Sequence, residues 1–493
     1  MERLLSKKLE ILHLLLILAI SILLRINSMG AKSLWQDDAW VALGLKATNL
    51  DEFKLTAGHH PGFSLLLTNL YNLFGFSELI SQLPSFIFGI SIPIIGYFAL
   101  KKNKFSSKFS LFFALVLASS PTLVLVSSRV KPYSFEAFIA VIYLFLLPLE
   151  KTLKKNILVF FLSLFSLLIS FYSVFIIAGY YFAVIDYKKY KFKDNQNLYF
   201  GFFVFIFFVL SYNIYLSTLP LISATSIHPH VYIEWPLIDI FEGIIGGFNS
   251  LGTGTILPFY LLKWTSLSAS DGDSLFYMLF YSFFTFLVLA NTKRIYNFNE
   301  ILAKYILSPI VITIIGTLFH RLIWGIGMPE QIRMLSSLIP GFAIWLLFSI
   351  QYSIKRQRVK SYGLATFYLF VFLTFLFYYK FQPYFDYPNQ DYRAAIEAIK
   401  KDASGSSWII KATDGTSPAS ALYDGSKEVE FGPGLHYSTK ISKSELVDLS
   451  DSDYDKVYIL YIENDRDLSS IGYKKDVFIY PDLGNLFVSK WEK

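Results

Sequence analysis

The chain has 493 residues, of which 54% are hydrophobic and only 16% charged, and it contains no cysteine. Its net charge of +7 is unevenly divided: residues 381–493 carry 13 Lys and Arg against 19 Asp and Glu, a balance of −6, whereas residues 1–380 carry 31 against 18, a balance of +13. These values exclude a single soluble globule, which would hold about 45 to 50% apolar and about 25% charged residues, and they exclude disulfides, zinc thiolates and cysteine nucleophiles.

Residues 1–380 consist of long apolar segments separated by short polar breaks. A segment of ~20 apolar residues crosses the hydrocarbon layer as an α-helix, which satisfies its own backbone hydrogen bonds there. The sequence therefore predicts a polytopic α-helical membrane protein with about 11 transmembrane helices. The clearest of these segments are 9–24, 109–126, 198–219, 275–290 and 362–379.

Lysine and arginine gather in alternate breaks of this membrane domain. Because cytoplasmic loops carry the excess of Lys and Arg, these breaks are predicted to be cytoplasmic. We therefore expect a multi-pass protein of the cell membrane with its amino terminus in the cytoplasm. The six breaks hold 21 cations, at residues 3–8, 101–108, 151–155, 188–193, 293–304 and 355–360.

Two of these cationic breaks, 151–155 and 188–193, are too close together for two full crossings between them. The apolar stretch 157–185 must nevertheless leave the cytoplasmic side and return to it. It is therefore predicted to form two short helices that meet near residues 171–173.

Two of the outer segments are long, residues 28–79 and 220–273. The first contains an apolar stretch of helical spacing, Pro61–Phe74, which is too short to span the membrane. A helix lying in the membrane interface is predicted there.

After Lys380 the composition becomes that of an ordinary soluble domain. Residues 381–493 are predicted to form a small C-terminal extracytoplasmic α/β domain. The expected elements are a helix over 389–401 and strands over 408–412, 457–462, 477–480 and 486–488.

Two adjacent carboxylates, Asp37 and Asp38, directly follow the first span and are flanked by Trp35 and Trp40. One interpretation is a solvated acidic turn with an aromatic belt. The other is functional, because carboxylates at the outer interface serve as a general base on a substrate hydroxyl or hold a divalent metal.

Histidines offer two weaker candidates. His59 and His60 precede Pro61, where they either bind substrate or metal or form the start of a helix with proline in its first turn. His228 and His230 have a spacing that suits a metal in a strand, but a solvated loop is favoured there.

Three outer cations form the last group. Arg129 and Lys131 lie with Tyr133 in a short turn, and Arg333 ends a later span on the same side. They either extend their charges to the interface or meet a lipid phosphate, which the arginine fork binds through two oxygens.

Together these features resemble the C-type integral-membrane glycosyltransferases, and within them the branch of protein O-mannosyltransferases and lipid A aminoarabinose transferases (family 39-like). The resemblance covers residues 1–380 and the outer domain. It rests on Trp35-x-Asp37-Asp38, His60-Pro61, Arg129-x-Lys131-Pro132-Tyr133 and Arg333 with Pro340.

The resemblance implies an inverting glycosyltransferase that moves a sugar from a polyprenyl-phosphate donor to a hydroxyl of a protein, lipid or glycan at the outer face. It implies that Asp37 is the general base and that Asp38 stands where the family usually has glutamate. The residues implied to bind substrate are His59, His60, Arg129, Lys131, Tyr133 and Arg333.

Besides Asp38, the chain departs from the family elsewhere: Gly62 follows His60-Pro61 where Pro-Pro is usual, Gln82-Leu83-Pro84-Ser85 stands where Arg-Leu-Pro-Ser is usual, and Tyr172-Ser173 where a histidine is usual. The sequence identifies no cofactor, and a divalent metal remains an alternative. The expected partners are the lipid-linked donor, the acceptor and membrane lipids, with no nucleic acid.

Two other classes of function remain alternatives, a transporter or flippase of lipid-linked sugars and a receptor-like protein. Transporters keep ionisable groups inside the bilayer, whereas the predicted spans here are almost free of them, which favours the enzyme.

Overall fold

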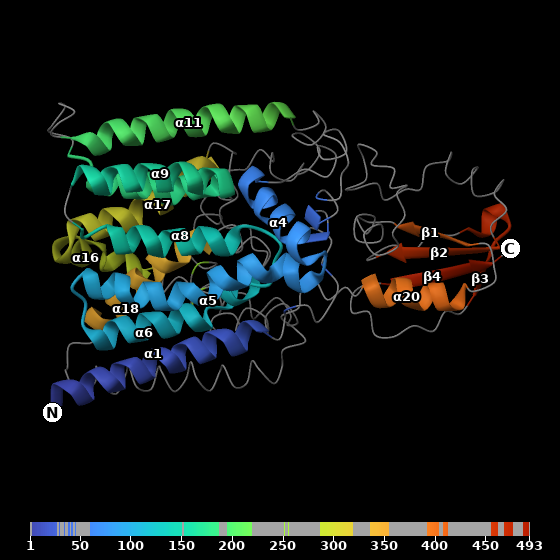
Figure 1. Cartoon of the computed structure of the whole chain (residues 1–493), viewed down its shortest axis with the longest axis horizontal. Coiled ribbons are helices and arrows are strands. Elements are labelled where there is room, and N and C mark those ends of the chain that lie inside the picture. Colours follow the sequence, from blue (N-terminus) through green and yellow to red (C-terminus); the bar gives the residue numbers. More distant parts are fainter. Residues whose placement is uncertain are drawn as a thin grey trace.

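The computed structural model shows a bundle of helices and, at one end of it, a small sheet with its own helix (Figure 1). It describes residues 2–26, 29, 34, 38–39, 41–42, 45, 60–149, 152–186, 195–218, 251, 255, 286–318, 336–353, 392–403, 408–412, 455–461, 468–476 and 487–492.

The helices of the bundle run alongside one another (Figure 1). Several begin at a serine or threonine whose side chain accepts a hydrogen bond from the first turn, as Ser77 does before α5 and Thr152 before α9. The helices are α1 (Glu2–Ile26), α5 (Glu78–Lys102), α6 (Ser107–Ser119), α7 (Pro121–Val126), α8 (Tyr133–Leu146), α9 (Leu153–Ile169), α10 (Val174–Val184), α11 (Gln196–Thr218), α16 (Thr292–Phe298), α17 (Glu300–Leu318) and α18 (Ile339–Ser353).

Three of the described helices are long and apolar enough to cross a membrane by length and composition: Lys8–Ile26, Glu78–Lys102 and Gln196–Ile214. Shorter apolar helices accompany them, and the outer faces of α1 and α11 expose large apolar side chains, as lipid-facing surfaces do. The predicted membrane protein is thereby supported, while the number of about 11 spans stays a prediction.

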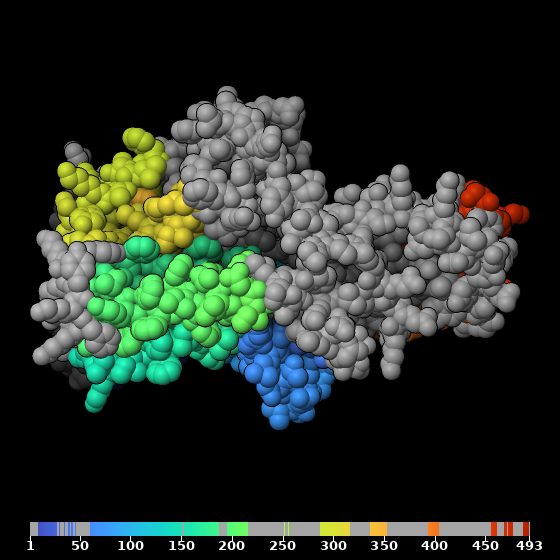
Figure 2. Space-filling view, turned by 90° about the horizontal axis from the view of Figure 1, so that it is seen from above, coloured from blue at the N-terminus to red at the C-terminus, as the bar shows by residue number. Residues whose placement is uncertain are grey.

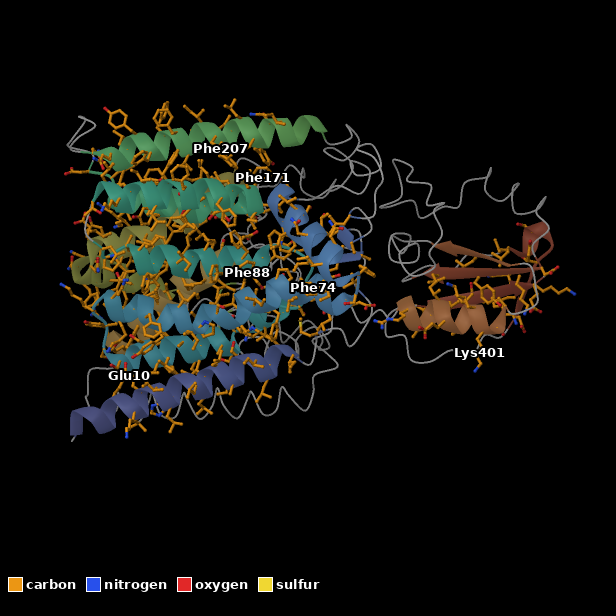
Figure 3. All side chains as sticks on the ribbon, viewed as in Figure 1. Glu10, Phe74, Phe88, Phe171, Phe207 and Lys401 are labelled. Carbon is orange, nitrogen blue, oxygen red and sulfur yellow. The ribbon has the colours of Figure 1, made fainter. Side chains whose placement is uncertain are left out.

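Aromatic rings fill the interior of the bundle. Phe88 of α5 lies against Phe135 and Phe138 of α8, with ring centroids 5.2 and 5.1 Å apart (Figure 3). Close approach of helices elsewhere depends on glycine, since a Cβ on Gly179 of α10 would lie 2.4 Å from Pro309 of α17.

One predicted span is divided. The apolar run 109–126 forms α6 and α7, because Pro121 donates no backbone hydrogen bond and disfavours helical backbone at Ser120 before it. The predicted pair of short helices in 157–185 is confirmed: α9 and α10 meet at the 3-10 turn η1 (Phe171–Ser173).

The cationic breaks that the structure describes lie at the same end of the bundle as the start of α1. Lys101 at the end of α5 lies 3.8 Å from Glu10 of α1. Phe105, in the same break, packs on Phe298 at the end of α16, with centroids 5.1 Å apart. The opposite end of the bundle faces the sheet (Figure 1).

The helix predicted over 61–74 is confirmed with its bounds, as α4 (Pro61–Phe74), while its place in the membrane interface stays a prediction. It lies across the bundle end nearest the sheet and projects from the body of the molecule (Figures 1 and 2). One face packs inward through Phe63 and Leu67, while Leu73 and Phe74 remain 74% and 66% exposed. This split into a buried and an exposed apolar face is typical of a helix at a membrane surface.

The C-terminal α/β domain contains α20 (Tyr392–Asp402), β1 (Trp408–Ala412), β2 (Lys456–Tyr461), β3 (Lys474–Asp476) and β4 (Phe487–Glu492). The strand order is β1-β2-β4-β3, with β1 and β2 parallel and the other pairs antiparallel. The predicted helix and first two strands are confirmed to within a few residues. The predicted strand 477–480 lies outside the described residues, and β3 was not predicted.

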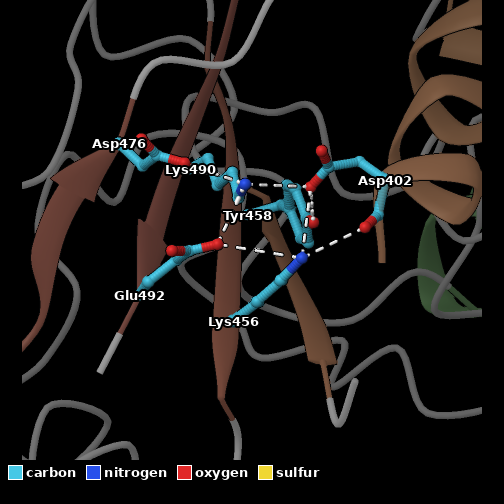
Figure 4. A network of polar contacts seen from close by, with 6 residues as sticks. All are labelled: Asp402, Lys456, Tyr458, Asp476, Lys490 and Glu492. Atoms are coloured by element: carbon cyan, nitrogen blue, oxygen red, sulfur yellow. Dashed lines mark hydrogen bonds and ion pairs between the residues drawn. The ribbon is translucent and has the colours of Figure 1, made fainter. Parts of the chain in front are cut away.

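A network of charges ties the end of α20 to the sheet (Figure 4). Asp402 accepts a hydrogen bond from Tyr458 at 2.5 Å and lies 3.2 Å from the Lys490 ammonium, which also lies 2.9 Å from Asp476 and from Glu492. Burial opposes ionisation of Asp402, but the bonds from Tyr458 and Lys490 outweigh it and lower the pKa of its carboxyl.

One ion pair joins the domain to the bundle. Arg393 of α20 lies 2.6 Å from Glu78, the first residue of α5. The C-terminal domain therefore contacts the bundle at the end where α4 lies.

Candidate functional site

Asp38 is a buried carboxylate, with 2% of its surface exposed. Its Oδ1 accepts a hydrogen bond of 3.1 Å from the backbone N–H of Val130, and its Oδ2 lies 3.5 Å from Nη1 of Arg129. The structure thus brings one member of the predicted acid pair against the predicted cationic turn. Asp37, Trp35 and Trp40 lie outside the described residues.

The cationic turn between α7 and α8 is fixed by bonds from helices that are distant in sequence. Ser85 of α5 donates to the carbonyl of Lys131 at 3.1 Å, and Ser336, just before α18, donates to that of Tyr133 at 3.0 Å. Tyr133 is buried and Lys131 is half-buried. These two bonds hold the backbone of the turn against α5 and the start of α18.

Arg25, in the last turn of α1, is a functional-site neighbour that sequence reasoning missed. It is fully buried and donates to Ser127 at 3.0 Å and to the carbonyl of Ala118 near the end of α6 at 2.8 Å. A guanidinium satisfies helix-end carbonyls well, because these carry partial negative charge. Its position at the end of an apolar segment was the feature of the sequence from which Arg25 could have been predicted.

The neighbouring helix must leave room for this arrangement. A Cβ on Gly89 of α5 would lie 2.7 Å from Cβ of Ser127 and 3.2 Å from Nε of Arg25. Arg25, Ser127 and Gly89 therefore form one close-packed support beneath the turn that holds Arg129.

His60 occupies the cap position of α4, with Pro61 in the first turn, but its side chain makes no capping bond. Instead, its Nδ1 accepts a hydrogen bond of 3.2 Å from the N–H of Phe171 in the α9–α10 turn. A nitrogen that accepts carries no proton, so His60 is held as the neutral tautomer with its proton on Nε2. His59 lies outside the described residues.

Glu136, in the first turn of α8, is the second residue that sequence reasoning missed. It is 1% exposed, and its Oε1 accepts a hydrogen bond of 2.7 Å from Ser170, which precedes the α9–α10 turn. Its Oε2 is buried and has no hydrogen-bond partner among the residues that the structure describes. The signal was a single acid inside an apolar run.

The charge of Asp38 also acts on α4. Burial raises the pKa of the Tyr71 hydroxyl to about 12, and the nearby Asp38 carboxylate adds to this rise although the bond to Ser81 opposes it. Tyr71 therefore stays protonated and bonds to Ser81 at 2.7 Å. The C-terminal part of α4 is thus within electrostatic reach of the acid.

The remaining candidates divide between described and undescribed residues. Gln82, where the family usually has arginine, is buried in α5, and Tyr172 packs on the ring of His60 at 6.0 Å. Within the described part of the chain, no three His, Asp or Glu side chains are placed to hold a metal ion. Arg333 and the His228–His230 loop lie outside it.

Comparison with known proteins gives a fold. No protein-family model and no curated protein matches the chain. Among solved structures, the crystal structure of ArnT from Cupriavidus metallidurans in the apo state is similar, with a TM-score of 0.55 and 9% sequence identity over 97% of this chain and 97% of that chain. At this identity the likeness shows the fold alone, and it extends over nearly the full length of both chains.

The chain therefore shares the fold of ArnT along nearly its whole length. The expected membership of the C-type glycosyltransferase superfamily stays a prediction. The narrower branch within that superfamily stays a prediction.

Proposed function

We propose that the chain is an inverting glycosyltransferase that moves a sugar from a polyprenyl-phosphate donor to an acceptor hydroxyl at the outer membrane face. The main observation in support of this proposal is that Asp38 forms an ion pair with Arg129 and accepts a hydrogen bond from the backbone N–H of Val130. It joins the acid pair to the cationic turn at the bundle end away from the described cationic breaks. The fold shared with ArnT, a glycosyltransferase, supports the reaction class.

The cations have the role of holding the leaving group. When the bond between sugar and phosphate breaks, its electron pair stays with the polyprenyl phosphate, whose charge Arg129 and Lys131 stabilise from fixed positions. Arg333 is proposed to add to them from a later span. No acid is needed to protonate the leaving group, since a phosphate leaves as an anion.

The acids have the role of activating the acceptor. As the acceptor oxygen bonds to the anomeric carbon, its proton passes to Asp37, and the single displacement inverts that carbon. Asp38 has one oxygen bonded to Val130 and the other facing Arg129, so we assign it the positioning of this segment. A glycosidase differs, because it needs two carboxyl groups on either side of the scissile bond.

The proposal is tested by Asp37→Asn in the full-length protein in lipid nanodiscs, with a polyprenyl-phosphate sugar as donor. We expect the release of polyprenyl phosphate to be abolished, because the amide accepts no proton, while protein yield and donor binding stay near those of the wild type. Full activity of this variant contradicts the assignment of Asp37.

The same assay separates the enzyme from a transporter. A flippase moves the lipid-linked sugar between leaflets and leaves its phosphate ester intact, whereas a transferase releases polyprenyl phosphate in proportion to glycosylated acceptor. Lipid movement without release by the wild type would favour the transporter.

A further inference from the structure

Only one of the two carboxyl oxygens of Glu136 has a hydrogen-bond partner among the described residues. Its Oε1 accepts from Ser170, but its Oε2 is buried without a hydrogen-bond partner among the described residues. A buried oxygen of this kind loses its water and gains nothing in return, so such groups are rare unless a ligand or ordered water completes them.

Glu136 lies between two elements already assigned to substrate binding. Its backbone N–H bonds to the carbonyl of Pro132, which places it one helical turn after the cationic turn. Its partner Ser170 is followed by Phe171, whose N–H holds His60. The carboxyl group therefore faces the junction of α8 with the α9–α10 turn.

A second orphaned group lies at the same junction. The Ser173 hydroxyl is buried and has no hydrogen-bond partner in the described part of the chain. Tyr172, next to it, lies near Tyr133 and Glu136. An acceptor, a hydroxyl and two phenol rings thus gather in one place.

This chemistry suits a sugar ring. Sugar hydroxyls form hydrogen bonds with a carboxyl group, and phenol rings pack on the apolar faces of the sugar ring. The donor phosphate is assigned to Arg129 and Lys131 instead. We propose that Glu136 binds a hydroxyl of the transferred sugar through Oε2, while Ser170 orients it through Oε1. The inference rests on the proposed function.

The test measures the affinity of the full-length protein in nanodiscs for two kinds of lipid. One is undecaprenyl phosphate, which has no sugar. The others are its glycosylated forms, the phosphodiesters that carry mannose, glucose or 4-amino-4-deoxyarabinose, and the glycosyl lipid that the wild type binds best is taken forward. Each lipid is titrated by native mass spectrometry.

Glu136→Met removes both oxygens and keeps a similar volume. We expect it to weaken the binding of the chosen glycosyl lipid about tenfold, as the loss of a buried hydrogen bond does, and to change the binding of undecaprenyl phosphate less than twofold. Glu136→Gln keeps an oxygen for Ser170 and is expected to weaken the binding of that glycosyl lipid about threefold.

Ser163→Ala is the matched control. Ser163 is also a buried serine of α9 bonded to α8, through the Tyr143 hydroxyl at 2.7 Å, but it lies nearly two helical turns before Ser170. We expect it to leave both affinities unchanged.

Three results would overturn the inference. If Glu136→Met and Glu136→Gln lower the affinities for both kinds of lipid equally, Glu136 only supports the fold. Unchanged affinities in both variants would mean that water completes the group. A wild type that binds undecaprenyl phosphate but binds none of the glycosyl lipids more tightly would leave no sugar contact to assign. A wild type that binds none of these lipids would instead contradict the proposed function itself.

Discussion

Asp38 shows how a side chain that is acidic in the sequence becomes a structural anchor. It is buried, and both of its oxygens face donors in the turn of Arg129 and Val130. An acid in this place fixes the segment that carries Asp37 relative to the cationic turn. Its loss should therefore act on activity through geometry.

Asp38→Asn keeps an oxygen for the Val130 N–H but removes the charge that faces Arg129. We expect the rate of transfer to fall at least tenfold with a smaller change in donor affinity, because the acid pair and the cationic turn lose their fixed spacing. Asp38→Ala should also lower the free energy of unfolding, by about 2 kcal/mol, since it leaves a buried donor unpaired.

The matched control for both variants is Glu10→Gln, which removes the acid of the more exposed pair with Lys101 at the other end of the bundle. It should change neither property, because exposed pairs contribute little. Wild-type rates in Asp38→Asn would contradict the positioning role.

The close packing at Gly89 gives a prediction about stability. Gly89→Ala places a methyl group 2.7 Å from Cβ of Ser127, and we expect the free energy of unfolding to fall by about 1–3 kcal/mol because α5 must shift away from the turn. Thermal unfolding of the purified protein measures it. Gly341→Ala in α18 is the control, since its new methyl group would meet Ile306 at an ordinary 3.7 Å. Equal midpoints for the two variants would contradict this account.

At the scale of elements, the parts of the fold that could be predicted are those set by local sequence. Length and apolar spacing predicted α4 with its bounds and the meeting of α9 and α10 at 171–173. Pro121 lacks a backbone N–H and disfavours helical backbone at Ser120, and it therefore divides a predicted span into α6 and α7. Strand β3 is short and its three residues are all polar, so it lacks the alternation of apolar and polar residues that predicts a strand.

The site could be predicted only in part. Asp38, Arg129 and Lys131 could be predicted because they are charged residues at the ends of apolar segments. The roles of Arg25 and Glu136 depend on partners that are distant in the sequence, Ser127 and Ser170, and no pattern within one helix reveals such partners. The bond that fixes the tautomer of His60 is also non-local.

The charge network on α20 gives a prediction about pH. The pKa of Asp402 is lowered in the folded chain, so its ionised form adds stability above its unfolded pKa, and this is lost as pH falls through the folded value, below about pH 4. Asp402→Asn should therefore speed hydrogen exchange of α20 at neutral pH, and the difference from the wild type should vanish in acid.

Glu397→Gln, a change at an exposed acid of the same helix, provides the comparison. Exchange of α20 that is the same in Asp402→Asn and Glu397→Gln at neutral pH would show that the network does not hold the helix.

At the scale of the whole molecule, the distribution of charge predicts the orientation in the membrane. The cationic breaks that the structure describes share the bundle end of the α1 start, and the sheet lies at the other end. We therefore expect the first end in the cytoplasm and the sheet outside.

The absence of cysteine makes this orientation simple to measure, because a single introduced thiol has no background. In intact cells, a membrane-impermeant maleimide should label Lys474→Cys in β3 and leave Lys108→Cys in α6 unlabelled. Both should react after the cells are opened. The reverse pattern would place the proposed site on the cytoplasmic side.

The ion pair between Arg393 and Glu78 has a consequence for how the outer domain responds to its surroundings. The arginine side chain is 38% exposed, so dissolved ions reach the pair and screen it, with a Debye length of about 8 Å at physiological ionic strength and about 3 Å in molar salt. Attachment of the domain at α5 therefore weakens as salt concentration rises. We therefore expect the bundle end beside α4 to separate from this domain more readily in molar salt than at physiological ionic strength.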